Sequence, residues 1–218
     1  MRAAAALLLI ACGLATAACG HAPQADAAMN EEMAAKVENR LMDPDKVMAD
    51  RWKGMFANPA RVVSAANEFD YQSGAYRQSG TGWRAVGKEQ LLPKDADPAI
   101  LVRTGFAATG AKADLIDTVS FTFDFVQKRK AKTQKEADSL RYPPRIVGGF
   151  LSRFEVGTGD EIRNALQGRT SASREKYGVA MRVNAQPIPG GKPDDRHLTV
   201  TFTRTGASAP VNSQTQGK

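Results

Sequence analysis

Residues 118–126 read TVSFTFDFV, so that apolar and polar side chains alternate along almost the whole stretch. The face made by the odd-numbered positions carries one valine and three phenylalanines, and the other face carries mainly threonine, serine and aspartate. A period of two in β-branched and aromatic residues predicts a strand that is buried on one face only. Because aromatic side chains bury the largest areas, the phenylalanine face predicts the centre of the hydrophobic core.

Similar alternation before and after this segment predicts four more strands. Residues 82–88 and 100–107 precede it, and a connection that contains proline and aspartate separates the two. Residues 179–183 and 198–202 alternate on either side of a turn-rich loop, which predicts a closing hairpin.

Three short helices are predicted ahead of the strands. Asn30, Asp43 and Asn58 are N-cap residue types, whose side chains can accept hydrogen bonds from the first turn of a helix. Proline follows the last two, at a helical position that needs no amide hydrogen. The predicted helices span about 30–41, 44–56 and 59–69.

More helices are predicted between the central strand and the hairpin. Thr133 and Glu136 have capping-box spacing, which predicts a helix that runs to about residue 141. Tyr142 should end this helix, because a residue before proline avoids the helical region of backbone conformation. Two further helices are predicted at about 146–154 and 160–166.

This order of elements predicts a single α+β domain over residues 30–204. We expect an antiparallel sheet of about five strands, with the N-terminal and inserted helices packed on one face. Residues 70–82 are expected to form an irregular loop. Residues 205–218, which are rich in small and polar side chains, are expected to form a disordered tail.

Residues 1–18 have the three parts of a secretory signal. Arg2 supplies the positive region, residues 3–11 an uncharged apolar segment, and small residues follow. The apolar segment is shorter than the about 20 residues that a membrane-spanning helix needs. The sequence therefore predicts export, with the small and polar residues 19–29 as a flexible tether.

The stretch TAACG at 16–20 resembles the bacterial lipobox, in which a cysteine becomes the first residue and is lipidated on its sulfur. Threonine stands where that motif usually has leucine. Cys12 would be removed with the signal, so Cys19 would be the only cysteine of the mature chain. The resemblance implies a lipid anchor at Cys19. The alternative is plain cleavage at a small-residue site, either 15–17 or 25–27, which would give a soluble periplasmic protein.

The composition is that of a folded, basic chain. Hydrophobic residues make up 42% and charged residues 24% of the sequence, values that are typical of globular domains. The net charge of +7 attracts anionic partners without identifying one. In an exported protein, we expect such a partner to be anionic lipid, acidic polysaccharide or an acidic protein surface.

Most of the net positive charge is concentrated between residues 127 and 145, where seven positive and two negative side chains give a net charge of +5. This segment follows the predicted central strand, so it should project at one edge of the sheet. Aromatic residues for stacking on bases are missing apart from Tyr142, so no nucleic-acid partner is expected. We interpret the segment as a candidate docking surface for anions, with a solvated loop as the alternative. Its basic members are Lys128, Arg129, Lys130, Lys132, Lys135, Arg141 and Arg145.

Signals for catalysis and metal binding are weak. His197 is the only histidine inside the predicted domain, so a triad with a nucleophile would have to use it. Residues 194–197 include metal-ligating types, but neighbours on an extended chain point in opposite directions. We therefore expect no metal and no cofactor.

Carboxylates for glycoside hydrolysis are available, although each also fits a strand exterior, a turn or a helix N-terminus. They are Asp70, Asp117, Asp124, Glu155, Asp160 and Glu161. We expect a non-catalytic binding or assembly module of the bacterial envelope, anchored through Cys19 to the outer membrane and facing the periplasm. The alternative is an exported enzyme that acts on a cell-wall or other anionic polymer through a carboxylate pair.

Overall fold

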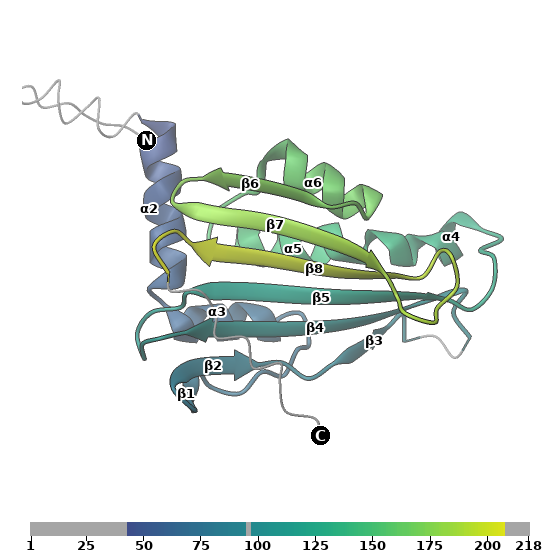
Figure 1. Cartoon of the computed structure of the whole chain (residues 1–218), viewed down its shortest axis with the longest axis horizontal. Helices are drawn as coiled ribbons and strands as arrows, with labels where there is room; N and C mark the ends of the chain where they lie inside the picture. Colours follow the sequence, from purple (N-terminus) through teal and green to yellow (C-terminus); the bar gives the residue numbers. More distant parts are fainter. Residues whose placement is uncertain (1–42, 95–96, 208–218) are drawn as a thin grey trace, which may run out of the picture. The chain divides into compact units, whose positions relative to one another are not determined.

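The computed structural model describes residues 43–94 and 97–207. The predicted signal at 1–18, the tether at 19–29 with Cys19, and the predicted helix at 30–41 lie outside the described residues. So does most of the predicted tail, although Thr205 at its start donates a hydrogen bond to the Gly178 carbonyl at 2.9 Å. The described part forms an α+β fold, as predicted (Figure 1).

Two helices begin at the predicted residues. They are α2 (Pro44–Phe56) and α3 (Pro59–Asn67). The Asp43 carboxylate accepts hydrogen bonds from two backbone amides in the first turn of α2, and the Asn58 side chain accepts one in the first turn of α3. These caps satisfy amides that have no partner inside the helix.

The inserted helical segment confirms one local prediction and corrects another. It comprises α4 (Gln134–Ala137), the 3-10 helix η1 (Asp138–Arg141), α5 (Tyr142–Ser152) and α6 (Gly159–Gly168). Thr133 and Glu136 form the predicted capping box. The prediction for Tyr142 is wrong, because its φ of −58° and ψ of −45° are helical. The two prolines that follow occupy the first turn of α5, where amide hydrogens are not needed, so η1 passes directly into α5.

In the described part of the chain, eight strands form one antiparallel sheet. They are β1 (Arg77–Ser79), β2 (Gly82–Val86), β3 (Gln90–Leu92), β4 (Ile100–Gly110), β5 (Thr118–Gln127), β6 (Ala172–Lys176), β7 (Val179–Pro187) and β8 (Arg196–Arg204). The order is β1-β2-β4-β5-β8-β7-β6, and β3 pairs with β4 off this path. The predicted central strand, β5, therefore lies in the middle of the sheet.

The expectation of about five strands is corrected to eight. The sequence pattern predicts β2, β4, β5, β7 and β8, but not β1, β3 or β6. β1 and β6 are the two edges of the sheet, and neither has a buried residue. Strands without a buried face need no apolar alternation, so their sequences carry no signal. For the same reason, the loop expected at 70–82 contains β1.

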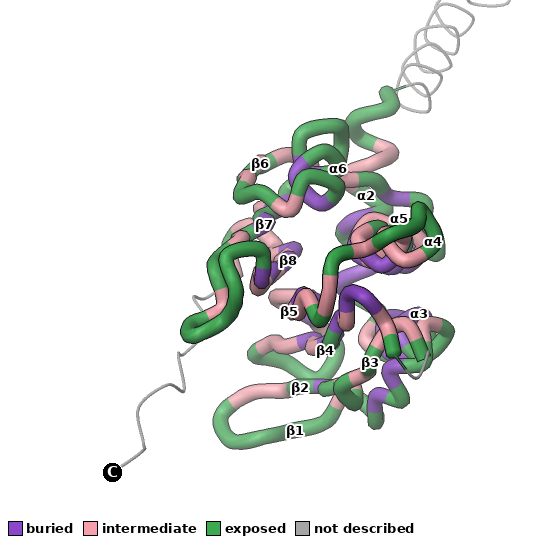
Figure 2. The backbone as a smooth tube through the Cα atoms, turned by 90° about the vertical axis from the view of Figure 1, so that its right-hand side faces the viewer, coloured by how far each residue is buried: buried purple, intermediate pink, exposed green. Residues whose placement is uncertain are grey.

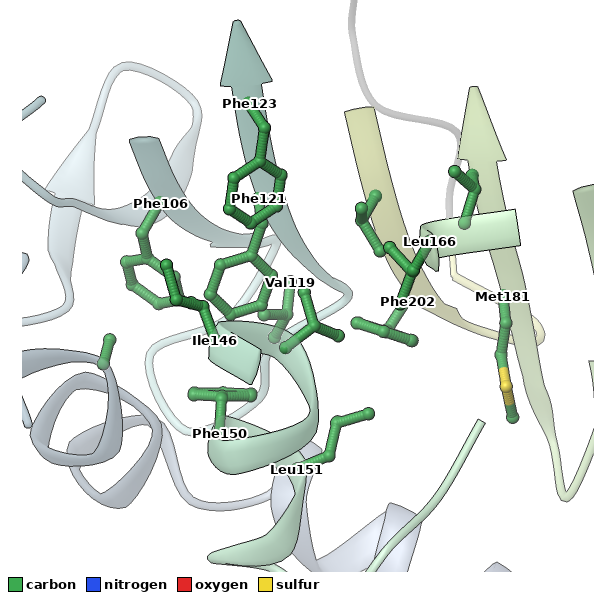
Figure 3. Close-up of a cluster of buried hydrophobic side chains, with 14 of the residues drawn as sticks. Phe106, Val119, Phe121, Phe123, Ile146, Phe150, Leu151, Leu166, Met181 and Phe202 are labelled. Carbon is green, nitrogen blue, oxygen red and sulfur yellow. The ribbon is translucent and has the colours of Figure 1, made fainter. Parts of the chain in front are cut away.

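The core lies between the sheet and the helices, which gather on one side of it (Figure 2). The phenylalanine face of β5 is at its centre. The Phe121 ring lies 5.1 Å from that of Phe150 on α5 and 5.4 Å from that of Phe106 on β4 (Figure 3). At one end of the core, Trp52 of α2 packs on Phe202 of β8 at 5.5 Å. The strand that decides the fold therefore also organises the core.

The opposite face of the sheet is polar. In the pairing of β5 with β8, Thr118 faces Thr203, Ser120 faces Thr201, and the next pair is again two threonines. Within residues 43–94 and 97–207, none of the helices combines the length and apolar character needed to cross a membrane.

Candidate functional site

The predicted basic segment lies at the end of the sheet where β5 ends, on the right in Figure 1. Its three arginines are paired with nearby acids. Arg129 is 2.7 Å from Glu136, and Arg145 donates two hydrogen bonds to Asp138 at 2.7 and 3.1 Å. Arg141 lies 3.8 Å from the same Asp138 carboxylate. These guanidinium charges are therefore largely balanced within the segment.

The four lysines of the segment are different, because none forms an ion pair with another described residue. Lys130 lines a cavity at this end of the sheet, whereas Lys128, Lys132 and Lys135 are exposed and line neither that cavity nor a second one between the helices. The predicted docking surface is therefore not a single patch, because its three arginines are paired with acids and only one of its lysines, Lys130, lines the cavity at the end of the sheet.

A cavity of about 490 Å³ lies where β4 begins, β5 ends and β8 begins, and we call it the basic cavity. Apolar side chains form part of its lining, among them Ile100, Phe125 and Leu140. Its charged lining consists of three cations and one carboxylate: Lys130, Arg169, Arg196 and Asp194. This combination of an apolar wall and excess positive charge suits an anionic ligand.

Arg169 occupies an unfavourable position in this cavity. It follows the last residue of α6, and its backbone angles of φ 54° and ψ 45° are left-handed, a conformation that residues other than glycine rarely adopt. Its Nε is buried without a hydrogen-bond partner, and its guanidinium carbon lies 5.7 Å from the centre of the Phe125 ring. Burial lowers the pKa of Arg169, and the charge of Arg196 lowers it further, while Asp194 acts in the opposite direction. Strain and a perturbed pKa in one cavity residue are typical of ligand-binding positions.

The loop between β7 and β8 is fixed to the end of β5 by Asp195, which is only 4% exposed. Its carboxylate accepts hydrogen bonds from the amides of Gln127 at 2.8 Å and Lys192 at 2.9 Å. The Gln127 amide is the main cause that lowers the pKa of Asp195 below its ordinary 3.8. This attachment holds the sequence neighbours of Asp195, Asp194 and Arg196, at the basic cavity.

A second cavity, of about 870 Å³, lies between η1, α5 and α6, and we call it the helical groove. Its apolar lining includes Leu140, Leu151, Val156 and Leu166. Three arginines also line it: Arg141, Arg145 and Arg163. Two residues that the sequence places in the docking surface, Arg141 and Arg145, therefore belong to this groove.

The six carboxylates considered for hydrolysis are dispersed, and none lines the basic cavity or the helical groove. Five of them contact a basic side chain. These contacts are Asp70–Lys94, Asp117–Arg204, Asp124–His197, Glu155–Arg51 and Asp160–Arg163. The structure therefore brings no pair of these acids together in either cavity.

His197 lies on the polar face of the sheet. Its Nδ1 contacts the carboxylate of Asp124, the residue opposite it on β5, and its Nε2 lies 2.9 Å from the Thr199 hydroxyl. Asp194, by contrast, lines the basic cavity, and Asp195 is buried in the loop. In the described part of the chain, no three histidine, cysteine, aspartate or glutamate side chains are grouped so as to hold a metal ion.

The sequence does not identify Arg169, Arg196 and Asp194 as one site. Arg196 and Asp194 stand out only as part of the stretch 194–197, and no local pattern marks Arg169. Their proximity depends on the pairing of β5 with β8 and on the end of α6, contacts between distant parts of the chain. No protein-family model, curated protein or solved structure matches this chain, so its function is inferred from its own residues and geometry.

Proposed function

We propose that this domain is a non-catalytic binding module that holds an anionic group, phosphate or carboxylate, in the basic cavity. The observation that carries the proposal is the convergence of Lys130, Arg169 and Arg196 on one cavity that Asp194 alone balances. Like charges so placed repel one another, and a bound anion would offset that repulsion.

Arg169 is the side chain best suited to contact such an anion. Its side chain lines the basic cavity and forms no ion pair with a described residue, although the charge of Asp194 acts on it. A guanidinium presents paired donors that match the oxygens of phosphate and carboxylate. The neighbouring Phe125 and Leu140 reduce the local dielectric, which strengthens charge–charge attraction.

Replacing Arg169 by glycine is expected to separate binding from stability. Loss of one charged hydrogen-bonding group should weaken binding of inorganic phosphate by about 10-fold or more. Glycine adopts the left-handed conformation without strain, so the unfolding free energy should stay the same or rise by about 1 kcal/mol. Isothermal titration calorimetry at low ionic strength measures the first effect, and urea denaturation the second.

Arg77→Gln is the matched control, because Arg77 is an exposed arginine on edge strand β1 and lines neither cavity. It removes the same charge and should leave phosphate affinity within about twofold of the original, since exposed distant charges are screened. Equal phosphate affinities for Arg169→Gly and the unmodified protein would refute the proposed site.

We further propose that the module is exported and held at the outer membrane, facing the periplasm, by lipid attached to Cys19. The signal-like residues 1–18, the lipobox-like stretch 16–20 and the absence of any other cysteine after the signal support this. Each buried methylene contributes about 0.8 kcal/mol to membrane affinity, so two or more acyl chains would anchor the module firmly.

The Cys19→Ala variant is therefore expected to move from the membrane fraction to the soluble periplasm. Cys12→Ala is the control, because Cys12 would be removed with the signal and should not affect the distribution. Cell fractionation with intact-mass measurement checks both. An unmodified N-terminus at residue 18 or 28 in the original protein would rule out the lipid anchor and favour a soluble periplasmic form.

A further inference from the structure

The helical groove adjoins the basic cavity, and two segments of the chain form walls of both: α4 with η1, and the end of α6. Ala137 and Leu140, on one wall, line both cavities. On the other wall, Leu166 and Gln167 of α6 line the groove, and the next residues, 168–170, line the basic cavity. A ligand whose anionic group occupies the basic cavity can therefore extend into the groove.

The groove offers an apolar surface to such an extension. Leu151, Val156 and Leu166 line it and are 2%, 7% and 2% exposed, so they form a base continuous with the core. Gly148 of α5 also lines it, and a Cβ added there would meet nothing within 4 Å apart from its own stretch of helix. Glycine weakens a helix interior, yet here it leaves open space above this apolar base.

The charges of the groove differ from those of the basic cavity. Each arginine that lines the groove has an acidic partner, Asp138 for Arg141 and Arg145, and Asp160 for Arg163. In the basic cavity, by contrast, Lys130 and Arg169 form no ion pair with a described residue. Of the cations that line the two cavities, those that form no ion pair with a described residue therefore lie in the basic cavity, at one end of the two adjoining cavities.

We propose that the ligand is a single-chain anionic amphiphile, with its phosphate or carboxylate head in the basic cavity and its hydrocarbon chain in the helical groove. The inference rests on the anion binding proposed above. The cavity volumes of about 490 and 870 Å³ are of the size that holds small organic ligands. An acidic peptide helix fits less well, because its carboxylates would meet arginines that already have partners.

The test compares ethyl phosphate with octyl phosphate below its micelle concentration, by isothermal titration calorimetry. A fully buried methylene strengthens binding about fourfold, so partial burial of the longer chain should tighten binding at least about 30-fold. Gly148→Leu places a side chain in the groove and should weaken octyl phosphate binding about 10-fold or more, while ethyl phosphate binding stays unchanged.

Gly54→Leu is the matched control. Gly54 is also a helical glycine with open space at its Cβ, but it lies on α2 and lines neither cavity. Leucine favours the helix at both positions, so both variants should fold. Equal affinity of the original protein for the two phosphates would overturn the amphiphile and leave the anion site intact. Binding of neither would overturn both proposals, and equal losses of octyl phosphate binding in the two variants would overturn the groove as its site.

Discussion

Replacing Phe121 by alanine is expected to lower the unfolding free energy by about 3–5 kcal/mol, the usual range for a large core aromatic. Phe121 is 0% exposed and lies within 5.1–6.0 Å, ring centre to ring centre, of three other aromatic rings. These rings belong to Phe106 of β4, Phe150 of α5 and Tyr71. The alanine variant would therefore leave a void where the sheet meets the helices. The loss would approach the total stability of an ordinary domain.

Urea denaturation followed by the fluorescence of the buried Trp52 would measure this effect. Phe121→Leu keeps most of the volume and should cost less than about 1.5 kcal/mol. Leu91→Ala is the exposed control, because Leu91 is 51% exposed and should change stability by about 0.5 kcal/mol or less. Similar losses for Phe121→Ala and Leu91→Ala would contradict a core centred on β5.

A second large loss, about 2–4 kcal/mol at neutral pH, is expected for Asp195→Asn. The buried carboxylate accepts hydrogen bonds from two amides, those of Gln127 and Lys192. An asparagine oxygen can still accept from one of them, but its NH₂ group would face the other donor. Thermal unfolding at neutral pH measures the difference in stability.

The effect of Asp195→Asn should also depend on pH. Because the folded-state pKa of Asp195 lies below the ordinary 3.8, the carboxylate stabilises the fold fully above that value. Its contribution is lost as the pH falls through the folded-state pKa, so the Tm difference should be largest near pH 7 and narrow below about pH 4. Asp114→Asn, at an exposed aspartate that lines neither cavity and forms no ion pair with a described residue, should stay close to the original protein throughout. A Tm difference that is constant from pH 7 to pH 3 would contradict this role.

Sequence reasoning succeeded where the signal is local. The period of two in β5 and the caps at Asp43, Asn58 and Thr133 each depend on residues a few positions apart. It failed for β1, β3 and β6, because two of these are edges and β3 adds three residues beside β4. β1, β3 and β6 are strands because they pair with β2, β4 and β7, and their own sequences do not show this.

The candidate site was less predictable than the fold. The basic residues at 128–145 lie at the end of the sheet that holds the basic cavity, but their three arginines are paired with acids. The left-handed residue after α6 would be expected at Gly168, since glycine usually takes that role, yet it is Arg169. Whether a cation faces a cavity or a carboxylate depends on tertiary contacts that composition does not record.

The position of β8 beside β5 determines when the cavities can form during folding. One hydrogen bond between these strands joins Thr118 to Thr203, which are 85 positions apart, and another joins Gln127 at the end of β5 to Asp195 just before β8, 68 positions apart. The helices α4, α5 and α6 lie between the two strands in sequence. Closing so long a loop costs conformational entropy, and only the contacts formed when the strands pair offset that cost, which slows folding. A chain that has not yet paired its last strand therefore lacks Arg196 and the Asp195 attachment at the basic cavity. Completion of the sheet and readiness to bind an anion are expected to be the same kinetic event.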